Sequence, residues 1–462
     1  MDQATLETRL KALHDIGAPV SIPQNKETLV HNIIEASKIT RQFATLDVDT
    51  LVYIFTKYDA LVHHLNTLLK LDGKKPLQER VGQGNVAAIL PYNGPLMTFA
   101  LAFAGAYLFP ENSFEIKPAG ESQKVFEKFI EMIPDADMAM HLYNANRTPR
   151  ISTESGMKFL TRHLSPASGT KVIEVYGHDS MITPEVEKML MANTSVRYIL
   201  EGPGKNWFVV GENPASVRCA ETMLKAGLLN SGQSCMAGEI YVIHDSVYEK
   251  IIDYISKLAN HVVVGDPHKA STDVGPLKNS LAKRIEEQVK DALEKGATIA
   301  YCSKEAKLLE RTEHFYDINP ERFRLIPYDA EHMLVPVIIL KDVTSKMKVR
   351  HDETFGPVIA IGKYHHGSEI IPELWRARYG LEATVFGSVD TALMQTLDAN
   401  FGHIFQDAYF LDPGQFDILL SPWGGKNYSR FSLQGITKYG NAGIEKIQTG
   451  PDYIVLDFSK EP

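Results

Sequence analysis

Of the three cysteines in this 462-residue chain, Cys235 has the setting that best suits nucleophilic chemistry. It ends residues 230–235, which read NSGQSC and form a small polar turn between a predicted helix and a predicted strand. A thiol at the end of such a loop can be exposed and have its thiolate favoured, although a buried and inert cysteine is the alternative. Cys219, within a helical run, and Cys302, after a short strand, are expected to be structural.

Two further segments place polar side chains where predicted strands end. Glu201 follows the strand at 196–200 and enters a Gly-Pro-Gly loop, where it is either a general base, if burial raises its pKa, or a solvated loop residue. Asn93 follows the strand at 86–90 and either donates to an oxyanion or caps the next helix. In open α/β sheets, sites gather at these carboxyl ends.

The elements that would position these residues alternate between short apolar strands and helical patterns. Such alternation predicts parallel α/β sheets with crossover helices. The strands are expected at 86–90, 114–116, 172–175, 196–200, 208–210, 240–243, 335–340 and 383–386. The helices are expected at 97–108, 121–133, 184–191, 215–229, 247–258 and 277–295, after a helical region that fills the first seventy residues.

Residues 81–110 contain no charged side chain, which is long enough on paper for a membrane span. Polar residues and the break at Gly94-Pro95 interrupt this stretch, so a buried strand followed by a buried helix is expected instead.

Composition narrows the class of protein. The chain is 44% hydrophobic and 23% charged, with a net charge of −9, which fits a globular protein of two or three domains and not a nucleic-acid-binding one. Its few cysteines form no disulfide framework, and the N-terminus has no secretory pattern, so a cytoplasmic location is expected.

Two suggestive motifs are set aside. Residues 82–87 match a dinucleotide-binding glycine pattern, but they precede a predicted strand instead of following one, so these glycines are interpreted as turn residues. The pairs His63-His64 and His365-His366 have no familiar ligand spacing beside them, and no metal site is predicted.

Six segments in register resemble the motifs of the aldehyde dehydrogenase superfamily. NSGQSC at 230–235 is similar to the family's NxGQxC, and EGPGK at 201–205 is similar to its ELGGK, with Cys235 lying 34 positions after Glu201 as in the family. The other four are PYN at 91–93 for PWN, KPA at 117–119 for KP(S/A), ETFGP at 353–357 for ExFGP and SPWGG at 421–425 for PFGG. The match runs colinearly from about Val81 to Phe458.

The resemblance implies two doubly wound α/β domains, a Rossmann-like cofactor domain at 1–210 and a catalytic domain at 211–440, with a tail at 441–462. It implies oxidation of an aldehyde to a carboxylic acid with NAD or NADP. Cys235 would be the nucleophile, Glu201 the general base and Asn93 the oxyanion donor. The cofactor-binding residues would be Lys117 and Glu353 at the two riboses, Phe355 at the nicotinamide, Gly177 at the phosphates, and Tyr92 and Glu121 beside them.

Several departures from the family pattern leave points open. Gly120 stands where the family often has a ribose-binding glutamate, so the choice between NAD and NADP is unresolved. Asp179 would repel a pyrophosphate unless it turns away, and Pro203 could shift Glu201. Residues 72–81 are short where the family has an oligomerisation hairpin, and residues 304–324 resemble an insertion.

Two alternative functions also stand at this point. An acylating enzyme would pass the thioester to coenzyme A, although such members usually lack the glutamate matched by Glu201. An inactive member would serve as a binding protein, which the altered loops keep open. A strand pattern at 444–458 suggests pairing in a homodimer, and the identity of the aldehyde is not predicted.

Overall fold

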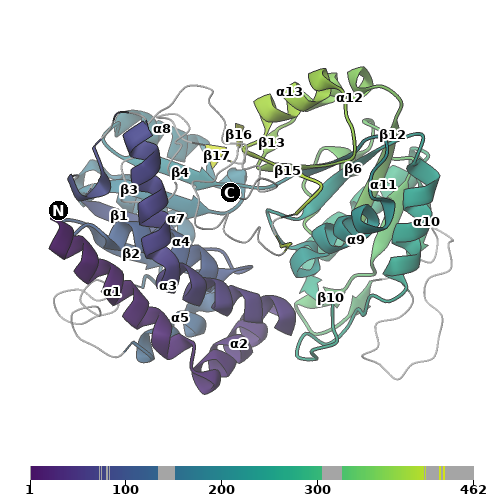
Figure 1. The fold of residues 1–462 in the computed structure, drawn as a ribbon. Coiled ribbons are helices and arrows are strands. Elements are labelled where there is room, and N and C mark those ends of the chain that lie inside the picture. Colours follow the sequence, from purple (N-terminus) through teal and green to yellow (C-terminus); the bar gives the residue numbers. More distant parts are fainter. Residues whose placement is uncertain are drawn as a thin grey trace.

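The computed structural model describes residues 2–133, 151–303 and 325–412, apart from 72, 74, 80, 81, 83 and 410, together with 426, 427, 430 and 431. Two open sheets with helices on both faces stand side by side (Figure 1), the first drawn in purple to blue and the second in teal to green. The predicted α/β class, with a Rossmann-like domain and a second doubly wound α/β domain, is confirmed.

The chain begins with three helices that form an outer layer on the helices covering one face of the first sheet. They are α1 (Gln3–Val20), α2 (Pro23–Ser37) and α3 (Arg41–Leu71). The Asp2 side chain accepts from Thr5 N at 2.8 Å and caps α1, while Pro23 starts α2 at a position that needs no amide donor. In α3, Leu51, Ile54 and Phe55 recur at helical spacing and are buried, as their pattern predicts.

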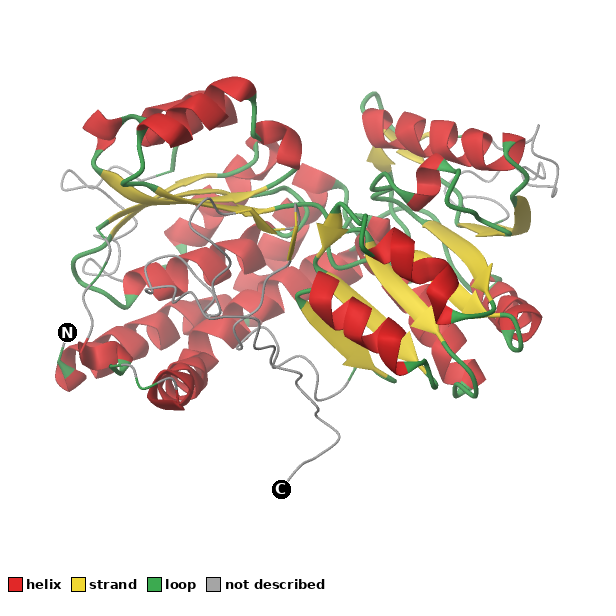
Figure 2. Ribbon diagram, turned by 90° about the horizontal axis from the view of Figure 1, so that it is seen from above, coloured by secondary structure: helices red, strands yellow, loops and turns green. Residues whose placement is uncertain are grey.

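The first sheet has the order β17-β4-β3-β1-β2, and all of its strands are parallel except β17. The strands are β1 (Asn85–Ile89), β2 (Ser113–Lys117), β3 (Thr170–Tyr176), β4 (Arg197–Glu201) and β17 (Arg430–Phe431). Side chains alternate between the two faces: Val86 and Ala88 pack under α4 (Pro95–Tyr107) and α5 (Gln123–Glu131), whereas Ala87 and Ile89 pack under α7 (Gly156–Leu164) and α8 (Pro184–Ala192). Figure 2 shows helices above and below this sheet.

Helix α4 explains the uncharged stretch. It is buried by α3 and by the sheet, and Phe99 and Phe103 stack at its centre with ring centroids 5.0 Å apart. Among the residues that the structure describes, no helix combines the length and apolarity needed to cross a bilayer.

The second sheet has the order β15-β14-β5-β6-β12-β11-β8, with only β8 antiparallel to its neighbour. Its strands are β5 (Asn206–Val210), β6 (Gly238–His244), β8 (Thr298–Cys302), β11 (Ile338–Lys341), β12 (Val358–Tyr364), β14 (Glu382–Phe386) and β15 (His403–Gln406). One face is covered by α9 (Ser216–Gly227) and α10 (Tyr248–Ala259), the other by α11 (Asn279–Glu294), α12 (Gly367–Leu374) and α13 (Thr391–Asn400). A small antiparallel sheet, β7 (Leu277–Lys278), β10 (His332–Leu334) and β9 (Ile326–Pro327), extends from it.

The eight predicted strands and the six later helices are present with ends shifted by a few residues. The chain passes from the first sheet to the second between Glu201 and Asn206, several residues before the domain boundary predicted at 210. The sequence interpretation did not identify α7, β12, α12 or α13. The segment at 304–324, the motif at 421–425 and the strand pattern at 444–458 lie outside the described residues.

Candidate functional site

The loop before Cys235 holds a strained backbone. Asn230, Ser231 and Gly232 have φ of 50°, 60° and 76°, three consecutive residues in the left-handed region. That conformation is unfavourable for Asn and Ser, so other contacts must maintain it. Ser231 Oγ accepts from Gly275 N at 2.9 Å, and Asn230 Nδ2 donates to the carbonyls of Asn93 and Gln233 at 3.2 and 3.1 Å.

The segment after β1 reaches this loop from the first sheet. Asn93 Nδ2 donates to the carbonyl of Gln233 at 2.8 Å, two residues before Cys235, and the Tyr92 hydroxyl donates to Gln233 Oε1 at 3.1 Å. An amide nitrogen carries two hydrogens, and one of them is engaged by this bond. The contact fixes Asn93 beside the loop at 230–235, the predicted nucleophile loop, and leaves its second N–H outside this bond.

The loop after β4 packs against Cys235 itself. A Cβ added to Gly204 would lie 1.9 Å from the Cys235 carbonyl oxygen, so only glycine permits this approach. Asn206 Nδ2 donates to the same carbonyl at 2.8 Å and to that of Ala237 at 2.9 Å. Glu201, half-buried at the end of β4, lies close enough for its carboxylate to influence the Cys235 thiol, even with Pro203 in the loop.

Of the two settings that the sequence leaves open for Cys235, the surroundings in the cofactor-free protein do not favour the thiolate. Burial, followed by the carboxyl groups of Glu353, Glu382 and Glu201, raises the pKa of the Cys235 thiol to about 12. Each of these groups disfavours a negative sulfur. A base must therefore take the proton when Cys235 reacts.

A buried ion pair lies beneath the site. Lys205 Nζ and Glu239 Oε2 are 2.6 Å apart, with side chains 4% and 5% exposed. The Glu239 carboxylate also accepts from the backbone N–H groups of Thr354 and Phe355, both at 2.8 Å. One carboxylate thus joins the loop after β4, the strand after Cys235 and the segment at 353–357.

The segment at 353–357 carries two predicted cofactor residues. Glu353 is buried and accepts from Gly204 N at 3.1 Å, and burial together with the neighbouring Glu239 raises its pKa. Phe355 has φ of 55°, a conformation that the bond from its N–H to Glu239 supports. Its neighbour Gly356 presents a carbonyl that a Cβ on Gly232 would meet at 2.2 Å, so this segment also touches the nucleophile loop.

Lys117 and Gly177 lie at the carboxyl ends of β2 and β3, as the predicted cofactor site requires. Lys117 is buried, and its ammonium donates to the carbonyl of Pro118. Burial lowers its pKa, against the opposing effect of the Glu121 carboxylate. Gly177 donates its N–H to the Glu201 carbonyl at 3.0 Å, which joins the ends of β3 and β4.

The surroundings of Asp179 bear on whether its carboxylate would repel a bound pyrophosphate. Its side chain is buried, and its carboxylate is paired with the Arg378 guanidinium at 2.5 Å and with the Tyr379 hydroxyl at 3.3 Å. The carboxylate is therefore turned to the second sheet's side and compensated by a cation, so its repulsion of a pyrophosphate is offset.

Glu121 and Tyr92 meet a lysine from the second part of the chain. Lys278 forms an ion pair with Glu121, and its ammonium lies 4.1 Å from the centroid of the Tyr92 ring. Burial alone would raise the pKa of Glu121, but the hydrogen bond from Lys278 leaves it below its ordinary value. Burial raises the pKa of Tyr92 well above its usual range, so the phenol keeps its proton.

These groups suit a dinucleotide. A buried ammonium at Lys117 and a buried carboxyl at Glu353, with one backbone donor at 3.1 Å, are suited to bind ribose hydroxyl groups. Glu353 lies on a segment that hydrogen bonds connect to Glu239 and Gly204, which lie on either side of the loop at 230–235.

The comparisons with known proteins show which family the chain belongs to. The model of the aldehyde dehydrogenase family matches residues 1–320 and 324–448. The chain belongs to the aldehyde dehydrogenase family. As the family match implies, it oxidises aldehydes to carboxylic acids with NAD or NADP as cofactor.

Two relatives and one solved structure illustrate the family's range. A 3-sulfolactaldehyde dehydrogenase from Priestia aryabhattai is 24% identical over 83% of this chain and 69% of its own length. A D-glyceraldehyde dehydrogenase (NADP(+)) from Thermoplasma acidophilum is 24% identical over 96% and 83%. The structure of betaine aldehyde dehydrogenase from Staphylococcus aureus in complex with NAD+ has a TM-score of 0.69 at 19% identity, over 92% of this chain and 78% of that one.

Sequence interpretation missed several residues of the site. Lys205 and Gln233 were within quoted motifs but had no role, and Glu239, Asn206 and Lys278 belonged to no motif. Glu382, the first residue of β14, is also buried near Cys235, and burial raises its pKa well above the ordinary value. A charged residue directly before a predicted buried strand, such as Glu239 or Glu382, was the available signal.

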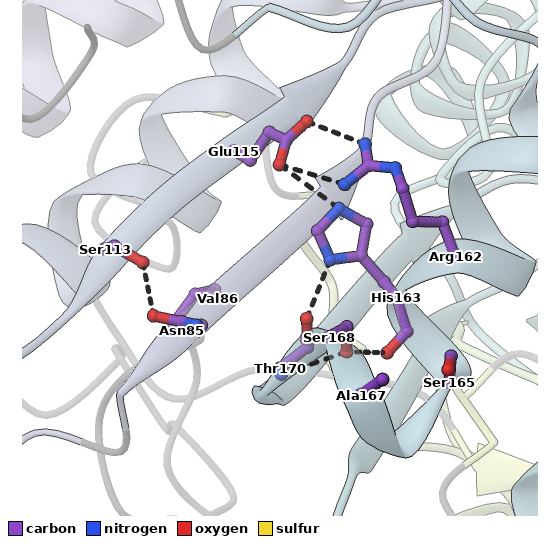
Figure 3. Close-up of a pocket in the computed structure, with 10 residues that line it drawn as sticks. All are labelled: Asn85, Val86, Ser113, Glu115, Arg162, His163, Ser165, Ala167, Ser168 and Thr170. Atoms are coloured by element: carbon purple, nitrogen blue, oxygen red, sulfur yellow. Dashed lines mark hydrogen bonds and ion pairs between the residues drawn. The ribbon is translucent and has the colours of Figure 1, made fainter. Parts of the chain in front are cut away.

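A cavity of about 710 Å³ elsewhere in the first part is a different feature (Figure 3). It opens where β1, β2 and β3 begin, whereas the predicted cofactor residues follow the strands' carboxyl ends. Its charged groups are already paired: Glu115 bonds Arg162 at 2.8 Å and lies 3.4 Å from the buried His163. Although burial opposes them, these two partners hold the pKa of Glu115 down at about 2.

The raised thiol pKa of Cys235 predicts its reactivity. In the cofactor-free protein, the rate of alkylation by iodoacetamide should keep rising about tenfold per pH unit from pH 7 to beyond pH 9, because the thiolate fraction grows until the pKa is reached. Mass spectrometry of the labelled peptide measures this rate. The Cys235→Ala variant gives the background from Cys219 and Cys302, and a plateau below pH 8 would contradict the raised pKa.

Proposed function

We propose that Cys235 is the nucleophile of this aldehyde dehydrogenase, with Asn93 and Glu201 as its partners. One observation carries the proposal: the Asn93 amide and the Gly204 backbone, from two strand ends of the first sheet, contact the loop and the carbonyl of Cys235. In this arrangement a carbonyl carbon attacked by the sulfur would lie beside an amide donor and within reach of a carboxylate.

Attack begins with transfer of the thiol proton. As sulfur bonds to the aldehyde carbon, the thiol proton passes to solvent and the carbonyl π electrons move to oxygen. The resulting oxyanion is held by Asn93 Nδ2 and the Cys235 backbone N–H. A donor of this type typically contributes about 3–4 kcal/mol to lowering the barrier.

Lys117 and Glu353 would hold the two riboses of the cofactor, with Phe355 beside the nicotinamide and Gly177 at the phosphates. Tyr92 and Glu121, which both contact the Lys278 ammonium, would lie beside the bound cofactor. Bound NAD or NADP supplies the hydride acceptor. The hydrogen on the substrate carbon leaves with its electron pair, the carbonyl re-forms, and a thioester on Cys235 results.

Hydrolysis of the thioester completes the cycle. Glu201 takes a proton from water, and the hydroxide attacks the thioester carbon. The carbon–sulfur bond breaks, the acid leaves, and Cys235 regains a proton. A hydrolytic carboxylate close to Cys235 favours water over coenzyme A as the acceptor.

We further propose a cytoplasmic homodimer. All three cysteines are free thiols, which suits a reducing compartment. The dimer rests on the strand pattern at 444–458, because such a strand can pair across a sheet edge. Sedimentation at micromolar concentration tests it, and the mass of a single chain would contradict it.

The absorbance of reduced cofactor, measured across a small panel of aldehydes, tests whether Cys235 is the nucleophile. NAD and NADP are run in parallel, each with and without coenzyme A. Turnover should occur without coenzyme A. It should fall below detection in Cys235→Ala, because this variant has no thiol with which to form the thioester. Cys219→Ala, which removes a buried thiol on α9, is the matched control and should retain turnover. A dehydrogenase rate surviving in Cys235→Ala, or a strict need for coenzyme A, would contradict the proposal.

Glu201→Gln separates the two halves of the reaction. The amide cannot activate water, so thioester hydrolysis should slow by about 100-fold or more. Rapid mixing should then show a burst of reduced cofactor, close to one per active site, before a slow steady state. If Glu201 has only a structural role, no burst forms and both phases slow together.

A further inference from the structure

A second polar cluster lies at the carboxyl ends of the central strands of the second sheet, whereas Cys235 precedes the amino end of β6. His244 ends β6, and His365 follows β12. The two strands pair in parallel with Tyr364 opposite His244, and Asp245 N donates to the Tyr364 carbonyl at 2.9 Å. This register brings two segments about 120 residues apart in sequence side by side.

Ligand atoms of His244, Asp245 and His365 converge. Each residue offers one such atom within 4.8 Å of those of the other two. Asp245 Oδ2 lies 2.6 Å from His365 Nδ1, and Asp245 Oδ1 lies 3.4 Å from His244 Nδ1. Tetrahedral zinc with bonds of about 2.1 Å requires ligand atoms about 3.4 Å apart. Small side-chain rotations therefore convert the cluster into a three-ligand site.

The charge around this cluster favours a cation. The ion-pair partners of Asp245 among the described residues are the histidines alone, and Glu212 adds a carboxylate oxygen 3.5 Å from His244 Nε2. No lysine or arginine of the described chain is paired with these carboxylates. Bringing a divalent ion here would thus displace no cationic partner.

A second histidine cluster lacks this property. His31, Glu35 and His268 also place ligand atoms within 4.8 Å of one another, where α2 meets the loop at 266–272. Glu35, however, is bonded by the Lys38 ammonium at 3.2 Å, which a metal ion would have to displace. This cluster supplies a matched control with the same kinds of ligand.

The first cluster also has an open side. Ser246 Oγ is hydrogen-bonded to His244 Nδ1 at 2.7 Å, and a metal ion bound at this nitrogen would replace that bond. A cavity of about 420 Å³ adjoins His244 and His365, and its lining includes Glu212, His366 and Asp390. Three protein ligands with an open fourth position are the usual arrangement of a reactive zinc site.

We propose that His244, Asp245 and His365 bind a divalent transition-metal ion of the zinc type, with the open position facing this cavity. Two imidazoles and one carboxylate are a ligand set that zinc prefers. The site is separate from the aldehyde chemistry, because the seven residues of β6 place it about 20 Å from the Cys235 end of the strand. Sequence spacing at His365-His366 missed it because the other ligands come from a neighbouring strand.

Zinc titration of the full chain against a chromophoric chelator measures the affinity. The Cys235→Ala background is used so that this thiol does not compete. One zinc per chain should bind, and cobalt loading should give the visible absorption of a low-symmetry site. His365→Ala and the size-conserving Asp245→Asn should each weaken binding by about 100-fold or more, whereas His31→Ala should leave it unchanged.

Three results would overturn the metal site: no stoichiometric zinc, zinc binding retained in both His365→Ala and Asp245→Asn, or loss of binding in His31→Ala. With Cys235 intact, His365→Ala should keep its dehydrogenase turnover, because the cluster lies far from the reacting sulfur. A collapse of turnover in this variant, with its circular dichroism unchanged, would contradict the separation of the two sites.

Discussion

The ion pair between Lys205 and Glu239 is the interaction on which the arrangement of the site depends. Both side chains are almost completely buried, at 4% and 5% exposure. Removing two charges from water is costly, so such a pair persists only with good geometry and additional hydrogen bonds. Here the carboxylate accepts from Lys205 Nζ and from the amides of Thr354 and Phe355. It therefore holds together the loop after Glu201, the strand after Cys235 and the segment of Glu353.

Close backbone contacts also hold the segments of the site together. Gly204 meets the Cys235 carbonyl, and Gly232 meets Gly356, at separations that no Cβ would allow. The Asn93 amide then bonds the carbonyl of Gln233 from the first sheet. Since these contacts come from both sheets, the nucleophile loop is held from several sides in a strained conformation that the local sequence alone would not favour.

Much of the fold and site could be predicted from the sequence, for local reasons. Strands such as β1 and helices such as α4 follow from short apolar runs, and the motifs around Cys235 and Glu201 are contiguous. Strand order is not local, so the place of β5 in the second sheet was not predicted. The raised pKa of the Cys235 thiol could not be predicted for the same reason, because Glu353 and Glu382 reach Cys235 only after folding. The His244–His365 cluster likewise depends on strand pairing.

A double-mutant cycle of Lys205→Met and Glu239→Gln, read as the free energy of unfolding in urea, tests the central claim most directly. Each single change should cost about 3–5 kcal/mol, because it leaves one buried group without its partner. The double variant should be more stable than the two losses combined predict, by a coupling of about 1–3 kcal/mol. Additive losses, with no coupling between the two positions, would contradict the account.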